Sequence, residues 1–191
     1  NFKKENNLNE KEIIALLPGS REQEVEKMLS LMLSVRDSFK NYQFVIAGAP
    51  SLPKEFYQKF VDDDVHFVSN KTYDLLRCSK AALVTSGTAT LETALLNVPE
   101  IVCYRTSTIS YEIGKRVVKN IKFISLVNLI MDREIVKELI QKELNTENLV
   151  AELQSILDGE KRDKMLENYE LLREKLGGKG ASEHAAEIIV N

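Results

Sequence analysis

Short apolar runs that alternate with helical patterns are the feature that most constrains the fold of this chain. The runs that look like strands are Ile13–Leu17, Phe44–Ala47, Val65–Val68, Ala81–Val84 and Ile101–Tyr104, and each is followed by a helix-like segment. Strands separated by helices pair in parallel, and a parallel sheet needs helices on both faces. The order of elements therefore predicts an α/β fold with a Rossmann-like, doubly wound parallel sheet.

Helical spacing marks the segment between the first two predicted strands and most of the C-terminal third. In the first segment, apolar residues at spacings of three and four predict the buried stripe of a helix over Glu22–Phe39: Val25, Met28, Leu29, Met32, Val35 and Phe39. Similar spacing covers Arg133–Gln141, Thr146–Leu157, Lys161–Leu176 and Ala181–Val190, with Gly177, Gly178 and Gly180 as a helix stop and turn. Helices from about residue 133 are therefore expected to close the domain.

Length and charge limit the number of domains and the class of partner. A chain of 191 residues with 43% hydrophobic residues suits one domain, which we place at residues 12–191 after a linker at 1–11. The net charge is −3 and basic residues are interleaved with acidic ones, so nucleic acid is not an expected partner. No apolar run has the roughly 20 residues that span a bilayer, and no signal peptide opens the chain. We expect a cytoplasmic protein and, because no initiator Met is present, a piece of a longer chain.

The loop that follows the first predicted strand, Leu17-Pro18-Gly19-Ser20-Arg21, has the composition of a phosphate-binding turn. Gly19 lets the backbone approach a ligand, Ser20 offers a helix cap and a hydroxyl, and Arg21 adds a forked cation. A tight turn with a cap and a solvated arginine explains the same residues equally well. Neither a Walker pattern nor GxGxxG is present, so an ATPase or a dinucleotide enzyme gains no support.

A second loop, Thr85-Ser86-Gly87-Thr88-Ala89-Thr90-Leu91-Glu92, follows the strand Ala81–Val84. Small residues with free amides at a helix start form an anion cradle, which the helix dipole strengthens, so a pyrophosphate fits Ser86–Ala89. Glu92 lies one turn further on, where its carboxylate can accept hydrogen bonds from two ribose hydroxyls. The alternative makes Glu92 an ordinary acid of a first helical turn. A sugar nucleotide would satisfy both loops.

Five strings along the chain are together specific for one family. LLPGSREQEVE, SGTATLETALLNVP, IVCYRTS, SLVNLI with the following REIVKELIQ, and LGGKGASEHAA occur in the order of the motifs of lipid-A-disaccharide synthase, and the chain resembles the C-terminal domain of that family. The resemblance implies the C-terminal half of a GT-B glycosyltransferase, whose two Rossmann-like domains face each other. It further implies joining of UDP-2,3-diacylglucosamine to 2,3-diacylglucosamine 1-phosphate, with inversion at the anomeric carbon and release of UDP, in lipid A biosynthesis.

The resemblance also assigns roles to residues of this chain. It implies Arg21 on the donor phosphates and Asn128 beside the donor as catalytic residues, Gly19, Ser20 and Ser86–Ala89 at the phosphates, and Glu92 at the ribose. Tyr104, at a strand end, is a further candidate for contact with the base or ribose, although a half-buried edge tyrosine is an equal explanation. The family commonly has SLPNL where this chain has Ser125-Leu126-Val127-Asn128-Leu129, so the backbone of this loop lacks a proline restraint.

No metal and no cofactor is implied by the resemblance, and the catalytic base and acceptor pocket belong to the N-terminal domain, which this chain lacks. We therefore expect the chain to bind donor or UDP without turnover. His66 and His184 are interpreted as structural, Cys78 and Cys103 as reduced packing residues, and Asp62-Asp63-Asp64 as a loop rather than a metal site. The basic segment Tyr111–Lys122 is interpreted as a solvated helix face, with contact to an anionic inner membrane as the alternative. Homo-oligomerisation is left open.

Two other function classes compete with this interpretation. Another GT-B enzyme acting on UDP-N-acetylglucosamine, either the transferase of peptidoglycan synthesis or a 2-epimerase, shares the helix-start cradle and the ribose glutamate. A non-catalytic nucleotide-binding or interaction module of flavodoxin-like architecture is the candidate from outside the enzymes. The LPGSR loop and the closing motif favour lipid-A-disaccharide synthase.

Overall fold

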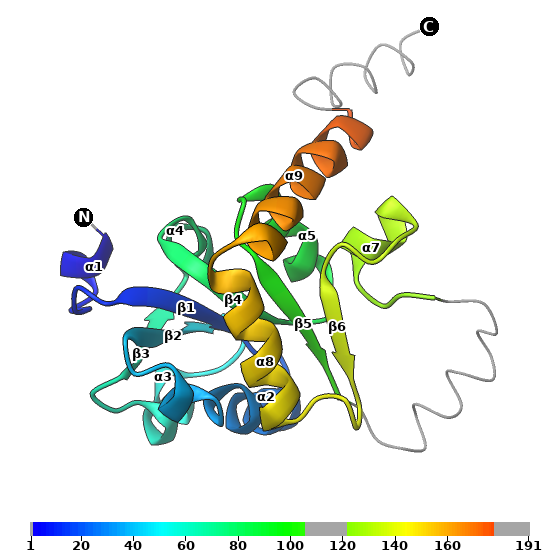
Figure 1. Ribbon diagram of the computed structural model, residues 1–191. Coiled ribbons are helices and arrows are strands. Elements are labelled where there is room, and N and C mark those ends of the chain that lie inside the picture. The colour runs from blue at the N-terminus through cyan, green and yellow to red at the C-terminus, as the bar shows by residue number, and fades with distance from the viewer. Residues whose placement is uncertain (1, 106–121, 178–191) are drawn as a thin grey trace, which may run out of the picture.

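Six parallel strands form one sheet in the computed structural model, which describes residues 2–105 and 122–177 (Figure 1). Their order across the sheet is β3-β2-β1-β4-β5-β6. The strands are β1 (Glu12–Leu17), β2 (Tyr42–Gly48), β3 (Val65–Ser69), β4 (Ser79–Thr85), β5 (Glu100–Tyr104) and β6 (Lys137–Ile140). The five predicted strands are confirmed, and so is the doubly wound α/β class.

Helices connect the strands and cover the sheet. Those described are α1 (Phe2–Glu5), α2 (Glu22–Leu33), α3 (Lys54–Tyr57), α4 (Thr72–Arg77), α5 (Thr88–Leu95), α7 (Leu126–Met131), α8 (Thr146–Leu157) and α9 (Glu160–Lys175), with 3-10 turns at Arg36–Ser38 and Gln58–Phe60. Figure 1 shows α2 and α8 together on one side of the sheet, with α4 on the other. No helix in the described ranges is long and apolar enough to cross a membrane.

Alternate residues of each central strand pack into two separate hydrophobic cores. On β1, Ile14 and Leu16 pack with the buried stripe of α2 and with α8 and α9, whereas Ile13, Ala15 and Leu17 pack with α4. Side chains of a strand point alternately to its two faces, so a strand covered on both sides reads as a continuous apolar run. All six predicted stripe residues of α2 are buried, although α2 ends at Leu33 rather than Phe39.

The segment Arg133–Gln141 is a correction to the sequence analysis, which assigned it to a helix. Residues Lys137–Ile140 form β6, which pairs with β5 from Ile101–Lys137 to Tyr104–Ile140. Apolar side chains at Ile135, Val136, Leu139 and Ile140 fit a helical period. The open edge of β5 nevertheless offers a full row of backbone hydrogen bonds, and this tertiary pairing overrides the local pattern.

The first residues are a second correction, because residues 1–11 were expected to be a linker. Leu8 is buried, and Leu8 and Phe2 pack in the same core as α4. The buried Gln43 amide at the start of β2 donates to the carbonyls of Asn9 (2.8 Å) and Lys11 (2.7 Å) and accepts from Asn9 N (3.2 Å). The segment from Phe2 onward is therefore part of the domain.

The two long C-terminal helices match their predictions. The bounds of α8 coincide with the predicted Thr146–Leu157, and those of α9 differ by one residue at each end. Gly177 ends α9 with φ at 90°, a conformation that suits glycine. Gly178, Gly180, the predicted helix Ala181–Val190 and His184 lie outside the described residues, as does the basic segment except Lys122.

Candidate functional site

The two candidate loops begin opposite each other at the carboxyl edge of the sheet. Strands β1 and β4 are neighbours in the middle of the sheet, and Leu17, the last residue of β1, pairs with Val84. The chain order reverses between these strands, since β1 leads to β2 on one side and β4 leads to β5 on the other. In sheets of this kind ligands bind outside the carboxyl ends at such a switch point.

The loop after β1 depends on a glycine. Gly19 has φ at 103°, and a Cβ built there would lie 2.7 Å from Oε2 of Glu24. The N-cap of α2 is Arg21 rather than Ser20, and no side chain caps this helix, so the expected Ser20 cap is wrong. Ser20 is exposed, and its carbonyl accepts a hydrogen bond from Ser51 Oγ (2.8 Å). The first amides of α2 therefore stay available to a ligand.

Arg21 lies at the positive end of α2 with its side chain exposed. It forms no ion pair with another described residue. A guanidinium and a helix N-terminus are both attractive to an anion. Their coincidence at one point of the carboxyl edge favours an anion there, although Glu22 and Glu24 of the first turn of α2 add negative charge beside them.

The loop after β4 leads into α5, whose N-cap is Gly87. Gly87 has φ 147° and ψ −164°, a region that is essentially limited to glycine, and a Cβ placed on it would meet nothing within 4 Å. No side chain caps α5. The nearby threonine hydroxyls donate to backbone carbonyls instead, Thr90 Oγ1 to Gly87 O (2.9 Å) and Thr93 Oγ1 to Ala89 O (2.7 Å). The helix start is thus open, with Thr88 exposed and Ala89 half-buried.

Ser86 and Tyr104 are brought together across neighbouring strands. The amide of Ser86 donates to Cys103 O (3.4 Å), and its hydroxyl donates to Ile124 O (3.1 Å). Tyr104 follows Cys103 and is half-buried at the end of β5. Beneath this loop, Thr85 Oγ1 is buried without a hydrogen-bond partner in the described part of the chain. The predicted residues of the second loop therefore share one edge with Tyr104.

Glu92 lies one helical turn into α5 and is half-buried. Its charge and a hydrogen bond from the Tyr73 hydroxyl raise the pKa of Tyr73, an exposed residue of α4. Tyr73 is a neighbour of the second loop that the sequence does not reveal, because nothing in the pattern of Thr72–Arg77 marks this tyrosine. The Tyr73 hydroxyl therefore lies near the Glu92 carboxylate, and a hydroxyl is the kind of donor that a ribose also presents.

Comparison with known proteins gives this arrangement a family. The sequence model described as lipid-A-disaccharide synthetase matches residues 1–190. The chain belongs to the lipid-A-disaccharide synthetase family. Lipid-A-disaccharide synthase from Syntrophus aciditrophicus is 40% identical over 182 residues, which are 91% of this chain and 47% of that protein. The enzyme of the same name from Persephonella marina is 35% identical over 192 residues, covering 94% and 50%. The chain thus spans about half the length of these curated relatives.

Solved structures place this chain among the GT-B folds. WaaG, a glycosyltransferase involved in lipopolysaccharide biosynthesis, has a TM-score of 0.54 and 17% identity, with 98% of this chain and 50% of that chain covered. The spinosyn rhamnosyltransferase SpnG in complex with thymidine diphosphate has a TM-score of 0.62 and 11% identity, covering 96% and 46%. At these identities the likeness concerns the fold, which agrees with the predicted half of a GT-B enzyme.

Asn128, which the resemblance places beside the donor, forms hydrogen bonds within the fold. Its side chain is fully buried. Its Nδ2 donates to Val136 O (2.8 Å) and Glu138 Oε1 (2.9 Å), and its Oδ1 accepts from the amides of Ile135 (2.7 Å) and Val136 (3.0 Å). The predicted loop around it is the helix α7, capped by Ser125. Asn128 therefore clamps α7 to the start of β6.

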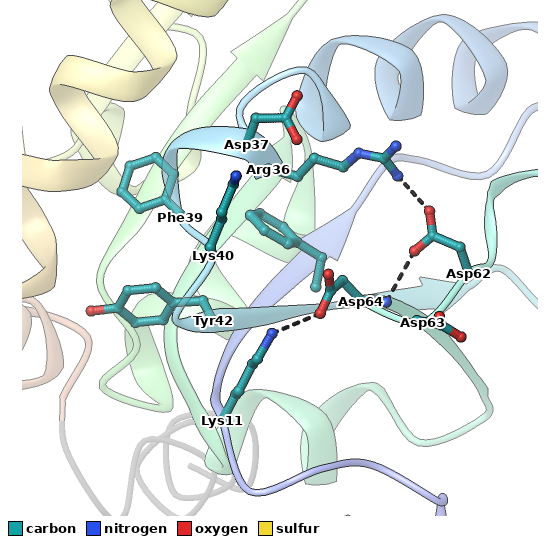
Figure 2. Close-up of a pocket in the computed structure, with 10 residues that line it drawn as sticks. Lys11, Arg36, Asp37, Phe39, Lys40, Tyr42, Asp62, Asp63 and Asp64 are labelled. Atoms are coloured by element: carbon teal, nitrogen blue, oxygen red, sulfur yellow. Dashed lines mark hydrogen bonds and ion pairs between the residues drawn. The ribbon is translucent and has the colours of Figure 1, made fainter.

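A hollow of about 580 Å³ lies at the opposite edge, among the amino ends of β1, β2 and β3 (Figure 2). Its charges are largely paired, with Lys11 Nζ 2.7 Å from Asp64 Oδ1 and Arg36 Nη1 2.5 Å from Asp62 Oδ2. Asp62 Oδ1 also accepts from the amides of Asp64 and Val65, both at 3.0 Å. Within residues 2–105 and 122–177, no group of three or more His, Cys, Asp and Glu side chains is arranged to hold a metal ion. Asp62 and Asp64 therefore have a structural explanation.

Burial shifts the pKa of two side chains of the sheet, His66 on β3 and Cys103 on β5. His66 on β3 has its Nε2 buried without a described partner, and burial lowers its pKa. Burial and the neighbouring Glu100 raise the pKa of the Cys103 thiol far above its ordinary value. Cys103 is thus a packing residue, as predicted, whereas Cys78 is an exposed free thiol, contrary to its predicted place in the packing.

Proposed function

We propose that this chain binds the UDP part of a sugar nucleotide at the carboxyl edge of β1 and β4. In this proposal Gly19, Ser20 and Arg21 contact the donor phosphates, and Ser86–Ala89 hold the pyrophosphate. Glu92 accepts hydrogen bonds from the ribose, and Tyr104 packs beside the ribose or base. The observation that carries the proposal is the pair of uncapped helix starts, α2 and α5, on adjacent strands of the switch point.

The chemistry of sugar transfer gives these groups a task. Departure of UDP develops negative charge on the β-phosphate. Fixed amides and a cation that are already aimed at that charge lower the barrier, because they need no rearrangement during the reaction. The first turns of α2 and α5 supply the amides, and Arg21 supplies the cation.

For the whole protein we propose the reaction of lipid-A-disaccharide synthase. UDP-2,3-diacylglucosamine would be joined to 2,3-diacylglucosamine 1-phosphate with inversion, giving the disaccharide 1-phosphate of lipid A biosynthesis and UDP. Family membership and two relatives at 35–40% identity support this proposal. Among the described residues, we assign no histidine or carboxylate beside Ser86–Ala89 as the catalytic base. We therefore assign the base and the acceptor pocket to the remainder of the protein, and this chain to donor binding without turnover.

Calorimetric titration of the chain with UDP, with GDP and uridine as controls, tests the proposed function. We expect UDP to bind, GDP to bind more weakly because its base differs, and uridine to bind most weakly because it lacks phosphates. A folded sample that binds none of the three would contradict donor binding by this chain.

Glu92→Ala is expected to weaken UDP binding by about 1–3 kcal/mol, the scale for losing hydrogen bonds to a charged group. The matched control is Glu147→Ala, which removes a first-turn acid from α8. Calorimetry of both variants with UDP separates a ribose contact from a general loss of negative charge. Equal affinity of Glu92→Ala and the unmodified chain would remove Glu92 from the site.

Arg21→Ala is expected to weaken UDP binding by about 1.5–3 kcal/mol, while uridine binding changes little, because the proposed partner of the guanidinium is phosphate. Arg36→Ala, which removes an exposed arginine at the opposite edge of the sheet, serves as the control. Parallel titrations with UDP and uridine provide the measurement. Equal losses for the two ligands would mean that Arg21 acts through folding instead.

A further inference from the structure

Glu138 on β6 is a buried carboxylate whose two oxygens accept four hydrogen bonds. Its Oε1 accepts from Ser125 N (2.9 Å), Ser125 Oγ (2.7 Å) and Asn128 Nδ2 (2.9 Å), and its Oε2 accepts from Ile124 N (2.9 Å). Every one of these donors belongs to α7 or to the turn that leads into it. A carboxylate is the side chain best suited to this place, because it accepts at both oxygens and donates at neither.

The turn that Glu138 holds also contacts the second candidate loop. The carbonyl of Ile124 accepts the Ser86 hydroxyl (3.1 Å), while the amide of Ile124 donates to Glu138. A single residue therefore joins the buried carboxylate of β6 to the first residue of Ser86–Ala89. Any shift of Ile124 would move the acceptor that orients the Ser86 hydroxyl.

Apolar packing and hydrogen bonds together fix the position of this turn, since Val127 is buried in the main core and Ile124 packs against that core. Helix α7 has only six residues, too few for a stable helix on its own. Asn128 fastens it to Val136, and the same Asn128 amide needs Glu138 for its second hydrogen bond. Without the carboxylate, the amides of Ile124 and Ser125 would lack their acceptor in the interior, which penalises the present position of the turn.

We propose that Glu138 is a positioning residue of the nucleotide site. It holds Ile124 and Ser125 in place, and through Ile124 it orients the Ser86 hydroxyl and the start of the Ser86–Ala89 cradle. Its effect on a ligand rests on the proposed function, because UDP is the ligand that this cradle is proposed to take. Its effect on the Ser86–Ala89 loop of the free chain is independent of the proposed function.

The test compares Glu138→Gln with Gln43→Ala. The control also removes a buried group that makes three hydrogen bonds, but it does so at the amino edge of β2. We expect Glu138→Gln to shift the backbone amide NMR signals of Gly87 and Thr88 in the free chain and to weaken UDP binding about five- to tenfold. Gln43→Ala should leave those signals and the affinity unchanged, whatever it does to the stability of the fold.

Ser86→Ala breaks the same link from the other end and leaves the buried carboxylate intact. We expect it to shift the amide signals of Ile124 and Ser125. In the double variant, UDP affinity should fall less than the sum of the single effects, because both changes act through one contact. If Glu138→Gln does not fold, the signals of Ser86→Ala decide alone, and unchanged Ile124 and Ser125 signals overturn the proposal.

Signals of Gly87 and Thr88 that respond to Glu138→Gln no more than to Gln43→Ala would also overturn it, leaving Glu138 with a purely structural role. Failure of the unmodified chain to bind UDP would count against the proposed function only. The amide signals of the free chain would still decide whether Glu138 positions the loop.

Discussion

Replacing Glu100 by methionine is expected to raise the free energy of unfolding by about 1–3 kcal/mol at neutral pH, the scale for relieving a buried polar group without partners. Glu100 begins β5 with its side chain fully buried, and neither carboxyl oxygen has a hydrogen-bond partner among the described residues. Methionine has a similar volume and needs no hydrogen bonds, so it fits the same space without this penalty.

The pH dependence of stability follows from the same group. Burial raises the pKa of Glu100 well above its ordinary value of 4.5. The folded protein therefore binds this proton more tightly than the unfolded chain, and stability falls as the pH rises from about 4.5 to the folded pKa. Urea unfolding of both proteins from pH 5 to 8 should show this decline in the unmodified chain, and Glu100→Met should remove it.

Glu138→Met is the matched control, because both glutamates lie buried on adjacent strands and differ in their partners. Glu138 accepts four hydrogen bonds, so its replacement leaves donors unsatisfied and should lower the free energy of unfolding. The two substitutions are thus expected to have opposite signs. A loss of stability in Glu100→Met would contradict the prediction and indicate that its carboxyl has a partner in solution.

Gly87→Ala is expected to weaken UDP binding at least tenfold, which is about 1.4 kcal/mol or more. A Cβ on Gly87 meets no protein atom within 4 Å and projects into the open mouth of the loop, where the pyrophosphate is proposed to bind. Alanine also strains the backbone at φ 147°, and we expect this strain to lower the stability by about 1–3 kcal/mol.

Gly159→Ala separates these two effects. Gly159 is the N-cap of α9 with φ 84° and ψ −169°, and its Cβ would likewise meet nothing within 4 Å. This variant should have a similar backbone strain and no change in UDP affinity. The measurements are calorimetric titration for binding and chemical denaturation for stability. If both variants bound UDP equally well, the anion would not sit at the start of α5.

The strands β1 to β5 are easier to predict from the sequence than the edge strand β6 and the opening residues. The strands β1, β2, β4 and β5 are largely buried and β3 is partly so, and the apolar runs of all five can be recognised without knowledge of their neighbours. β6 has only four residues, and its character depends on pairing with β5, which no local pattern reveals. The opening residues were missed for a related reason, since their attachment depends on distant partners, namely the core that receives Leu8 and the side chain of Gln43.

The candidate site is predictable where it rests on backbone chemistry. Gly19 and Gly87 stand out in the sequence because loops after buried strands and before helices use glycine for a specific conformation, and both have positive φ. Tyr73 and Glu138 come from elements remote from these loops in sequence, so only the packing of the elements shows their contacts. Asn128 illustrates the converse, because a motif identifies the residue but not the atoms that its amide contacts.

The place of each strand in the sheet also determines which parts of the site can open separately. Hydrogen bonds in the middle of a sheet break only with the unfolding of the whole domain, whereas an edge can detach in a local fluctuation. The two candidate loops follow β1 and β4, and each of these strands pairs with a neighbouring strand on both sides. β6 is a four-residue edge strand, and it carries the carboxylate that restrains Ile124. Transient fraying of this one strand would release the Ser86 hydroxyl while the two helix starts keep their positions.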